Sequence, residues 1–497
     1  MVYFTSEKGD CRMQKFFGRE QELEKLDALW RKDSSSLVVV AGRRRIGKST
    51  LIEEFARRSR CEFIELVGLA PDAKMTNQRQ IDNFCERLAK ATGMPEATAD
   101  CWPKAFDALD AALKRRGRTV VFLDEISWMG KYDTSFAAFL KTAWDTQFSR
   151  HDKMVFVVAG SVSAWIDRNI QRSKGFVGRI SLDFTLRELP LDKCVEFWGA
   201  RSGRTSTRDI LDVLSVTGGV PKYLCEIDPR LSPDENIKRL CFDADGYLFK
   251  DFDRIFDDVF GGTLAAKKRI LVALADGPAS VSELAAKFGS DPNGHLSSDL
   301  GELEEAGFVA GSFGMNPATG KPSREIRYRL RDNYTRFYLR YVLPKREAIR
   351  NGFFDYVAMD RLPGWETVMG LQFENLVLNN IPSLSRIVGL VGKNVESAAP
   401  YFRSGRKTGS GVQIDYLVQL PRCTYVFEIK RKGRIGRSVE DEVQQKIERL
   451  KLPRADRSRL CSSMTESLMP ASRKMAFLTM SCQRVGCSAD DLRMNLV

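Results

Sequence analysis

Residues 42–49 of the chain have the sequence Gly42-Arg43-Arg44-Arg45-Ile46-Gly47-Lys48-Ser49, which matches the phosphate-binding pattern GxxxxGK[ST]. The apolar run LVVVA at 37–41 predicts a buried strand before the pattern, and TLIEEFARR at 50–58 predicts a helix after it. A glycine-rich turn between strand and helix directs successive backbone N–H groups and a helix N-terminus at phosphate oxygens. The sequence therefore predicts a nucleotide site, with ATP and Mg²⁺ as cofactors.

Within this loop the residues have different expected roles. Lys48 is expected to contact the β- and γ-phosphates, and the Ser49 hydroxyl is expected to bind Mg²⁺. Thr50 opens the helix beside them. Because backbone amides hold the phosphates, the side chains of Arg43, Arg44 and Arg45 are expected to be solvated.

A second motif supports the first. VVFLDE at 120–125 is an apolar strand that ends in two carboxylates, about 75 residues after the phosphate loop. Asp124 is expected to hold Mg²⁺ through water, and Glu125 to polarise the water that attacks the γ-phosphate. A strand ending in Asp–Glu is otherwise an ordinary solvated turn.

Strand-like runs alternate with helical stretches on both sides of the loop. The runs lie at 37–42, 62–68, 119–125 and 154–160, and such alternation predicts βαβ units around a parallel sheet. Residues 15–186 are therefore predicted to form an α/β ATPase core. Residues 187–258 lose the strand runs and are predicted to form a helical lid.

An ordered set of motifs over residues 15–255 resembles the archaeal-type P-loop ATPases, which are related to AAA+ and STAND ATPases. The motifs are FFGREQEL, GRRRIGKST, VVFLDE, VVAGS, Gly178-Arg179 and GGVPKYL at 218–224. The resemblance implies that Arg179 stabilises the γ-phosphate, either within its own chain or from a neighbouring subunit of a homo-oligomer. It also implies that Pro221 lies near the adenine.

The sequence pattern changes over residues 262–340. Two short helical patterns, at 280–289 and 294–308, are followed by two strand-like runs separated by a Gly/Pro turn at 316–322. This order predicts a winged helix. The second helix contains four carboxylates and no Lys or Arg between His295 and Phe308, which disfavours entry into a DNA groove. A role in docking to another domain or to another subunit is favoured over base recognition, although the polar His295 keeps groove entry open.

The C-terminal part contains a second set of charged residues. Strand 412–420 alternates and places Asp415 on its polar face, and strand 425–430 places Glu428 and Lys430 together on one face. A hairpin between these strands would gather two carboxylates and one ammonium, a combination suited to Mg²⁺ and phosphoryl chemistry. The ordinary alternative is a solvent-facing ion-pair cluster.

The order of these residues resembles the PD-(D/E)XK nuclease superfamily, in particular the nuclease-like domain fused to archaeal-type ATPases. The resemblance covers residues 365–497. It implies that Asp415 and Glu428 bind metal and that Lys430 acts on the nucleophile. It also implies that Glu374 supports the metal, and that Gln444 or Gln445 assists from a following helix. One departure is that Ile414 stands where the superfamily has proline.

Composition narrows the remaining possibilities. The chain of 497 residues has only two histidines, which excludes His-rich zinc sites and makes a Ser–His–Asp hydrolase improbable. Its net charge is +13, and residues 401–460 hold 15 Lys and Arg against 7 Asp and Glu, which favours DNA as a partner of the C-terminal domain. The expected phosphate contacts are Arg403, Arg406, Lys407, Arg431, Lys432, Arg434 and Arg437. No apolar run suits a membrane span, so a cytoplasmic protein is expected.

Together these patterns predict an α/β protein with four parts: a P-loop parallel-sheet ATPase core, a helical lid, a winged-helix domain and a C-terminal restriction-endonuclease-like domain. Two functions remain open. The first is an ATPase coupled to a Mg²⁺-dependent deoxyribonuclease. The alternative is a STAND-like signalling or scaffold switch whose C-terminal domain binds DNA or protein without cleaving it. The two differ over Asp415, Glu428 and Lys430.

Overall fold

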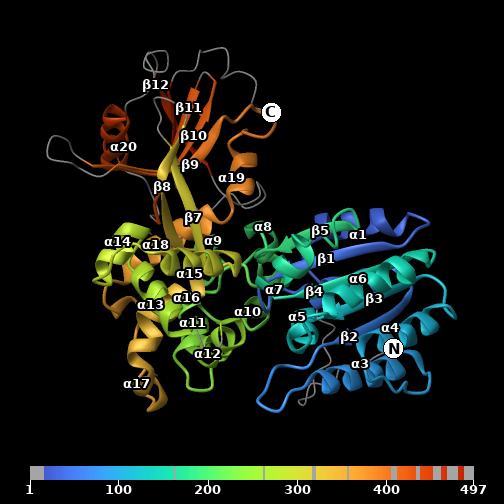
Figure 1. Cartoon of the computed structure of the whole chain (residues 1–497). Helices are drawn as coiled ribbons and strands as arrows, with labels where there is room; N and C mark the ends of the chain where they lie inside the picture. The colour runs from blue at the N-terminus through green and yellow to red at the C-terminus, as the bar shows by residue number, and fades with distance from the viewer. Residues whose placement is uncertain are drawn as a thin grey trace. The chain divides into compact units, whose positions relative to one another are not determined.

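A computed structural model of the whole chain (Figure 1) gives the fold of most of the sequence. It describes residues 16–161, 164–260, 264–315, 321–354, 357–403, 411–421, 423–431, 437–450, 460–466 and 480–485. The chain divides into two compact units. The first consists mainly of Gly47–Ala159 with the N-terminal residues and Lys174–Phe184, and the second of Ala41–Ile46, Gly160–Ser173 and Thr185–Val497.

The first unit is built on a five-stranded sheet with the order β2-β3-β4-β1-β5. Strands β2, β3 and β4 pair in parallel, as the alternating pattern predicts. Every residue of β1, β3 and β4 is buried, which explains their continuous apolar sequences. The strands are β1 (Ser36–Gly42), β2 (Glu62–Val67), β3 (Thr119–Asp124), β4 (Met154–Gly160) and β5 (Ile180–Leu186).

Strand β5 was not among the predicted strands. Its residues alternate between half-buried and exposed, so it lacks the apolar run that marks the other four. The helices of this unit are α1 (Glu20–Trp30), α2 (Lys48–Ser59), α3 (Asn77–Thr92), α4 (Trp102–Leu113), α5 (Ile126–Met129) and α6 (Phe136–Thr146).

Residues 187–260 are helical, as predicted. Their helices are α8 (Leu191–Cys194), α9 (Thr207–Thr217), α10 (Pro221–Cys225), α11 (Pro233–Cys241) and α12 (Tyr247–Phe260). Their apolar faces join one continuous hydrophobic core that extends from Leu189 through the following segments to Ile429. The predicted lid is thus packed into the same core as the segments that follow it.

The next segment contains the two helices and the hairpin that the sequence predicts, preceded by a further helix and a two-residue strand that were not predicted. Its three short strands form a separate sheet with the order β6-β8-β7. The elements are α13 (Leu264–Ala275), β6 (Ala279–Ser280), α14 (Val281–Lys287), α15 (Gly294–Glu305), β7 (Val309–Met315) and β8 (Pro322–Leu330). We call the β7–β8 hairpin the wing. Within the second unit the wing extends toward the C-terminal sheet (Figure 1).

The C-terminal sheet has the order β12-β13-β11-β10-β9, and each pair for which the register is known is antiparallel. Residues 467–479 lie outside the described residues, and the last strand begins at Met480. The elements are α16 (Asn333–Phe337), α17 (Arg346–Arg350), α18 (Trp365–Leu378), α19 (Ile381–Ile387), β9 (Ser397–Arg403), β10 (Val412–Leu420), β11 (Cys423–Ile429), α20 (Arg437–Arg449), β12 (Leu460–Glu466) and β13 (Met480–Val485).

Helix α18 is joined to α16 by a buried network of amides. Gln372 is fully buried and its Nε2 donates to the carbonyl of Asn333 at 2.7 Å. The Asn333 amide in turn donates to the carbonyl of Gln372 at 3.0 Å and to that of Ser215 on α9 at 2.8 Å. Because each of these groups would be costly to bury alone, the network fixes how α18 sits in the second unit.

No helix in the described ranges is long and apolar enough to cross a lipid bilayer.

Candidate functional site

The phosphate loop has the backbone that its sequence predicts. It leaves the buried strand β1 and enters α2 at Lys48, with Gly47 in the left-handed region at φ 88°. A side chain on Gly42 would come within 3.1 Å of Ile46 and Leu186, so the turn is too tight for a larger residue there. The loop therefore presents backbone amides at the start of α2, the arrangement that binds phosphate.

Ser49 and Asp124, the two residues expected to hold Mg²⁺, are in contact in the first unit. The Ser49 hydroxyl donates to Oδ2 of Asp124 at 2.6 Å, which links the first turn of α2 to the end of β3. The other carboxylate oxygen, Oδ1, accepts the backbone N–H of Glu125 at 2.9 Å. A hydroxyl and a carboxylate oxygen in contact form an all-oxygen donor set of the kind that Mg²⁺ prefers, so these two residues fit the ion.

Glu125 sits in a strained backbone position directly after the magnesium residues. Its φ is 51°, in the left-handed region that is unfavourable for a residue with a side chain. Gly68 at the end of β2 accommodates this turn, because a Cβ there would lie 2.8 Å from the carbonyl oxygen of Glu125. Its role as the water-activating base remains a prediction.

Two further carboxylates near Asp124 were missed by the sequence analysis. Burial, with the Asp124 charge, raises the pKa of Glu53. Burial, followed by the charges of Glu53 and Asp124, raises the pKa of Glu65 to about 7. Glu53 lies one helical turn after Ser49, and this i, i+4 spacing was the available signal.

The expectation that the arginines of the phosphate loop are solvated is wrong for two of them. Arg43 and Arg45 are not solvated: Arg43 is 7% exposed, and its Nη1 lies 2.8 Å from Oδ1 of the buried Asp332. Its guanidinium also lies 5.3 Å from the ring centroid of Phe308. Arg45 pairs with the buried Asp251. These contacts all belong to the second unit, which contains loop residues Ala41–Ile46.

The ATPase resemblance gives roles to Arg179 and Pro221, which lie in different local environments. Arg179 forms a two-pronged ion pair with Asp145 on α6, through Nε at 2.6 Å and Nη2 at 2.9 Å. The hydrogen bond from Arg179 holds the pKa of Asp145 down to about 2. Pro221 occupies the first turn of α10, where its fixed φ suits a helix start. Their roles toward a nucleotide remain predictions.

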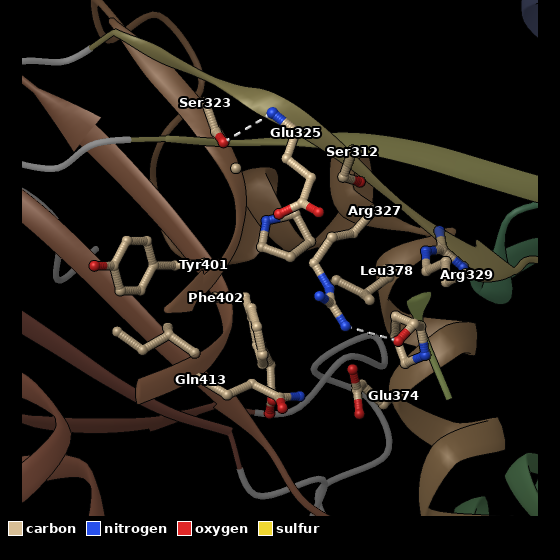
Figure 2. A pocket seen from close by; sticks show the side chains of 15 residues that line it. Ser312, Ser323, Glu325, Arg327, Arg329, Glu374, Leu378, Tyr401, Phe402 and Gln413 are labelled. Carbon is tan, nitrogen blue, oxygen red and sulfur yellow. Dashed lines mark hydrogen bonds between the residues drawn. The ribbon is translucent and has the colours of Figure 1, made fainter. Parts of the chain in front are cut away.

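The C-terminal carboxylates lie together in the second unit, beside the predicted hairpin. Strands β10 and β11 pair antiparallel with Tyr416 opposite Phe427, and Oδ2 of Asp415 accepts the backbone N–H of Ile429 at 2.6 Å. Glu374 and Asp415 line one cavity of about 110 Å³ (Figure 2 shows its lining residues). The two carboxylates of the hairpin, Asp415 and Glu428, are therefore buried rather than solvent-facing, whereas Lys430 remains about a third exposed.

Burial changes the protonation of this cluster. Asp415 is 7% exposed, and burial, with the charges of Glu374 and Glu428, raises its pKa to about 8. The pKa of Glu374 is also raised, chiefly by burial. Asp415 therefore holds a proton near neutral pH. A divalent cation would remove the electrostatic cost of ionising these groups.

Glu428 is fully buried and balanced by two lysines. Its Oε1 lies 2.6 Å from Nζ of Lys430 and 2.7 Å from Nζ of Lys446. Its Oε2 has no hydrogen-bond partner within the described residues. Lys446 on α20 was missed by the sequence analysis, which named Gln444 or Gln445. Gln444 instead donates to Glu448 at 3.3 Å, and Gln445 is exposed.

The donor types fit Mg²⁺, but the side chains do not yet form a completed site. Among the described residues no group of three carboxylate, histidine or cysteine side chains is close enough to hold a metal ion. Binding would require Glu428 to loosen its lysine contacts and Asp415 to lose its proton. The structure thus gathers Glu374, Asp415, Glu428 and Lys430 in one region without arranging them around an ion.

The proposed DNA-contacting arginines are only partly accessible. Arg431 is not available, because it pairs with Asp212 at 2.9 Å and Glu366 at 3.0 Å. Arg403 donates to the carbonyl of Arg449 at 3.1 Å. Arg406, Lys407, Lys432 and Arg434, and the side chain of Arg437, lie outside the described residues.

The comparison with protein families supports the ATPase domain that the sequence predicts in the N-terminal half. Residues 16–227 match the family model described as an ATPase domain predominantly from Archaea. The chain is 21% identical over 405 residues to the uncharacterized protein MJECL04 of Methanocaldococcus jannaschii, covering 81% of this chain and 84% of that protein. A 40-residue stretch, 8% of this chain, is 42% identical to the uncharacterized ATP-binding protein MJ0423 of the same organism and covers 68% of it.

Among solved structures, the Walker-type ATPase PABY2304 of Pyrococcus abyssi aligns with 67% of this chain and 99% of its own, at 17% identity and a TM-score of 0.44. The family match and the geometry of the phosphate loop, Ser49 and Asp124 lead to the same conclusion. Residues 16–227 are similar to the ATPase domains of that family and contain a P-loop at the start of α2.

Proposed function

We propose that the protein hydrolyses ATP at its phosphate loop and uses the nucleotide state to control a Mg²⁺-dependent nuclease-like site in its C-terminal part, with DNA as substrate. The ATPase half is supported by the contact between Ser49 and Asp124, which joins the two nucleotide motifs before any ion is bound. In this half, Lys48 binds the β- and γ-phosphates, Ser49 and Asp124 hold Mg²⁺, and Glu125 orients the attacking water.

The nuclease half depends on one observation: two buried carboxylates, Asp415 and Glu428, lie with the half-buried Glu374 and two lysines in one region of the second unit. Burying so much ionisable oxygen is costly unless a cation or a proton compensates it. The raised pKa of Asp415 indicates that protons do so in the absence of metal. We infer that Asp415, Glu428 and Glu374 hold Mg²⁺, which would stabilise the charge of a pentavalent phosphate.

In this proposal the chain's own groups have separate tasks. Lys430 lies on the solvent side of Glu428, with about a third of its side chain exposed, and orients the water nucleophile. Lys446 is less exposed and holds Glu428 in place from α20. The pairing of both lysines with Glu428 keeps them protonated and directed at the carboxylate.

A second function has its own support. The carboxylates are balanced by lysines and protons, and no completed ligand group exists among the described residues. A STAND-like switch needs no metal in the C-terminal part. In that case ATP would hold one conformation, and the C-terminal fold would bind DNA or a partner protein without cleaving it.

Plasmid cleavage distinguishes the two functions. Supercoiled plasmid is incubated with the full chain and Mg²⁺ or Mn²⁺, with and without ATP. Nicking by the native protein should fall at least 100-fold in Asp415→Asn, because loss of one metal ligand removes transition-state charge stabilisation. Asp441→Asn, which changes an exposed carboxylate on α20, is the matched control and should nick normally.

The binding of Mn²⁺ provides a readout that does not depend on cleavage. Calorimetry of the native protein should show a Mn²⁺ site, besides the one that ATP fills, that disappears in Asp415→Asn. Nicking that persists unchanged in this variant, or the absence of such a site, excludes the nuclease and leaves the switch.

A further inference from the structure

The cavity beside the carboxylates is bounded by two separate parts of the second unit. The wing contributes Ser312, Arg327 and Arg329, while β9 and β10 contribute Phe402 and Asp415 (Figure 2). Arg327 and Arg329 are two residues apart on β8, so their side chains leave the same face of the strand. The wing is thus one wall of the carboxylate pocket.

The wing arginine is held in a fixed orientation. Nη2 of Arg327 donates to the carbonyl of Pro278 at 2.9 Å, and Nη1 donates to Oε1 of Glu283 at 3.0 Å. Its guanidinium carbon lies 3.9 Å from the ring centroid of Phe402. A guanidinium that is hydrogen-bonded on two sides and lies over a ring forms a rigid planar stack.

Phe402 is unusual for an aromatic residue beside a buried charged cluster. Its side chain is 40% exposed, although the neighbouring Tyr401 is only 8% exposed. The arginine lies over the ring, yet much of the side chain remains open to solvent. An exposed aromatic ring fixed by a cation is a platform on which a planar ligand, such as a nucleobase, can stack.

The size of the cavity restricts what can reach the carboxylates. Its volume is about 110 Å³, which is smaller than a cavity of about 150 Å³ that holds one benzene molecule. This space accommodates a phosphate group and its ion, but not a base pair. Duplex DNA is stiff, with a persistence length of about 150 base pairs, and cannot bend locally behind a hairpin without a large deformation energy. An unpaired strand has no such restriction.

Building on the proposed nuclease-like function, we propose that this pocket takes an unpaired nucleic-acid strand, with a base stacked on the Phe402–Arg327 pair and the adjacent phosphate directed at Glu374 and Asp415. The wing therefore selects substrate by excluding duplex. Selectivity for unpaired bases comes from stacking, which every base supports, rather than from hydrogen bonds to particular base edges.

Fluorescence anisotropy tests this with the full chain in Ca²⁺, which is used to limit cleavage. The probes are a labelled single-stranded DNA of about 20 nucleotides, the same sequence as RNA, and the blunt DNA duplex. One or both unpaired strands should bind at least tenfold more tightly than the duplex, and the two unpaired probes show which sugar is preferred.

Variants then locate the contact. Phe402→Ala should weaken binding of the preferred single strand at least fivefold, since one stacked base is typically lost, while Phe402→Trp should retain it. Phe353→Ala, which removes a phenylalanine that is 72% exposed outside the pocket, should leave binding unchanged.

The outcomes separate the inference from the function on which it rests. Duplex binding as tight as single-strand binding, or equal binding by Phe402→Ala and the native protein, overturns the inference. If plasmid cleavage is still lost in Asp415→Asn, the proposed nuclease stands without it. If no probe binds and no cleavage occurs, both are wrong.

Discussion

The phosphate loop and the C-terminal carboxylate pocket both handle phosphate chemistry in our proposal, but they are built differently. In the first, the phosphate groove is made of consecutive backbone amides, and only Ser49, Asp124 and Glu125 need to meet from separate elements. In the second, Glu374, Asp415 and Glu428 come from a helix and two strands, and burial decides their charges. A site made from backbone tolerates neighbouring changes, whereas a site made from buried side chains depends on its surroundings.

The largest expected effect tests the first site. Glu125→Gln should bind ATP–Mg²⁺ normally but hydrolyse it about 100- to 10,000-fold more slowly, the range typical of losing a general base. Steady-state phosphate release and nucleotide binding are measured in parallel. Glu86→Gln, an exposed substitution on α3, is the control. Equal turnover by Glu125→Gln and the native protein would remove Glu125 from the mechanism.

Arg43 belongs to the phosphate loop, but unlike the loop backbone its side chain depends on tertiary contacts. Asp332→Asn should lower the free energy of unfolding by about 3 kcal/mol, since the buried Arg43 would lose its nearest counter-charge and keep only Glu188 at 4.0 Å. Asparagine can still cap α16 as Asp332 does, so the loss reports on charge. Chemical denaturation measures it.

Asp276→Asn is the matched control for this loss. It breaks the exposed ion pair between Asp276 and Arg340 in the same unit and should cost less than about 1 kcal/mol. Similar losses in the two variants would mean that the Arg43 pair is no more important than a surface pair.

A smaller effect is expected at the phosphate loop itself. Lys48→Ala should weaken ATP binding about 10- to 150-fold, the equivalent of one charge-assisted hydrogen bond of about 1.5–3 kcal/mol. Titration with a fluorescent ATP analogue measures the change. Lys25→Ala, on the exposed face of α1, should bind like the native protein. An unchanged affinity in Lys48→Ala would place the triphosphate elsewhere.

The smallest expected effects concern two carboxyl groups whose pKa is raised, Glu65 near the first site and Asp415 in the second. They are measured on the protein without metal or nucleotide. A carboxyl whose pKa is raised by folding keeps its proton in the native state and loses it in the unfolded state. The free energy of unfolding therefore falls as pH rises from the unfolded pKa to the folded one. For Glu65 this window ends at about pH 7, and for Asp415 at about pH 8.

Replacing either carboxyl group by an amide should reduce the pH dependence of the free energy of unfolding within that group's pH window. Between pH 5 and 8, Asp415→Asn should gain on the order of 2 kcal/mol relative to the native protein, and the less buried Glu65→Gln below about 1 kcal/mol. Urea unfolding in EDTA at several pH values measures both. A gain that is largest at low pH would contradict the raised pKa values.

Much of the first unit could be predicted from sequence because its signals are local. Four strands were predicted as continuous apolar runs, and the phosphate loop followed from glycine spacing. Strand β5 was missed because its alternating, partly exposed sequence lacks that signal. Glu53 and Glu65 were missed because their effect depends on how closely α2 and β2 bring them to Asp124.

In the C-terminal part the sequence predicted the hairpin and the residues Asp415, Glu428 and Lys430, but not their environment. Lys446 was missed because helical spacing alone does not show which polar residue faces a distant strand. The pairing of Arg431 with Asp212 joins residues more than 200 positions apart, and no local pattern signals it. The wing's position beside β9 was likewise not predictable, since it depends on the packing of the Arg327 side chain over Phe402.

By itself the sequence determined the ATPase domain, because glycine spacing, apolar runs and terminal carboxylates act through the backbone nearest to them. Only the tertiary structure decided that Arg43 is buried against Asp332, that Asp415 holds a proton, and that the wing closes one side of the carboxylate pocket. Each of these follows from desolvation, which depends on everything packed around a group rather than on its neighbours in the chain.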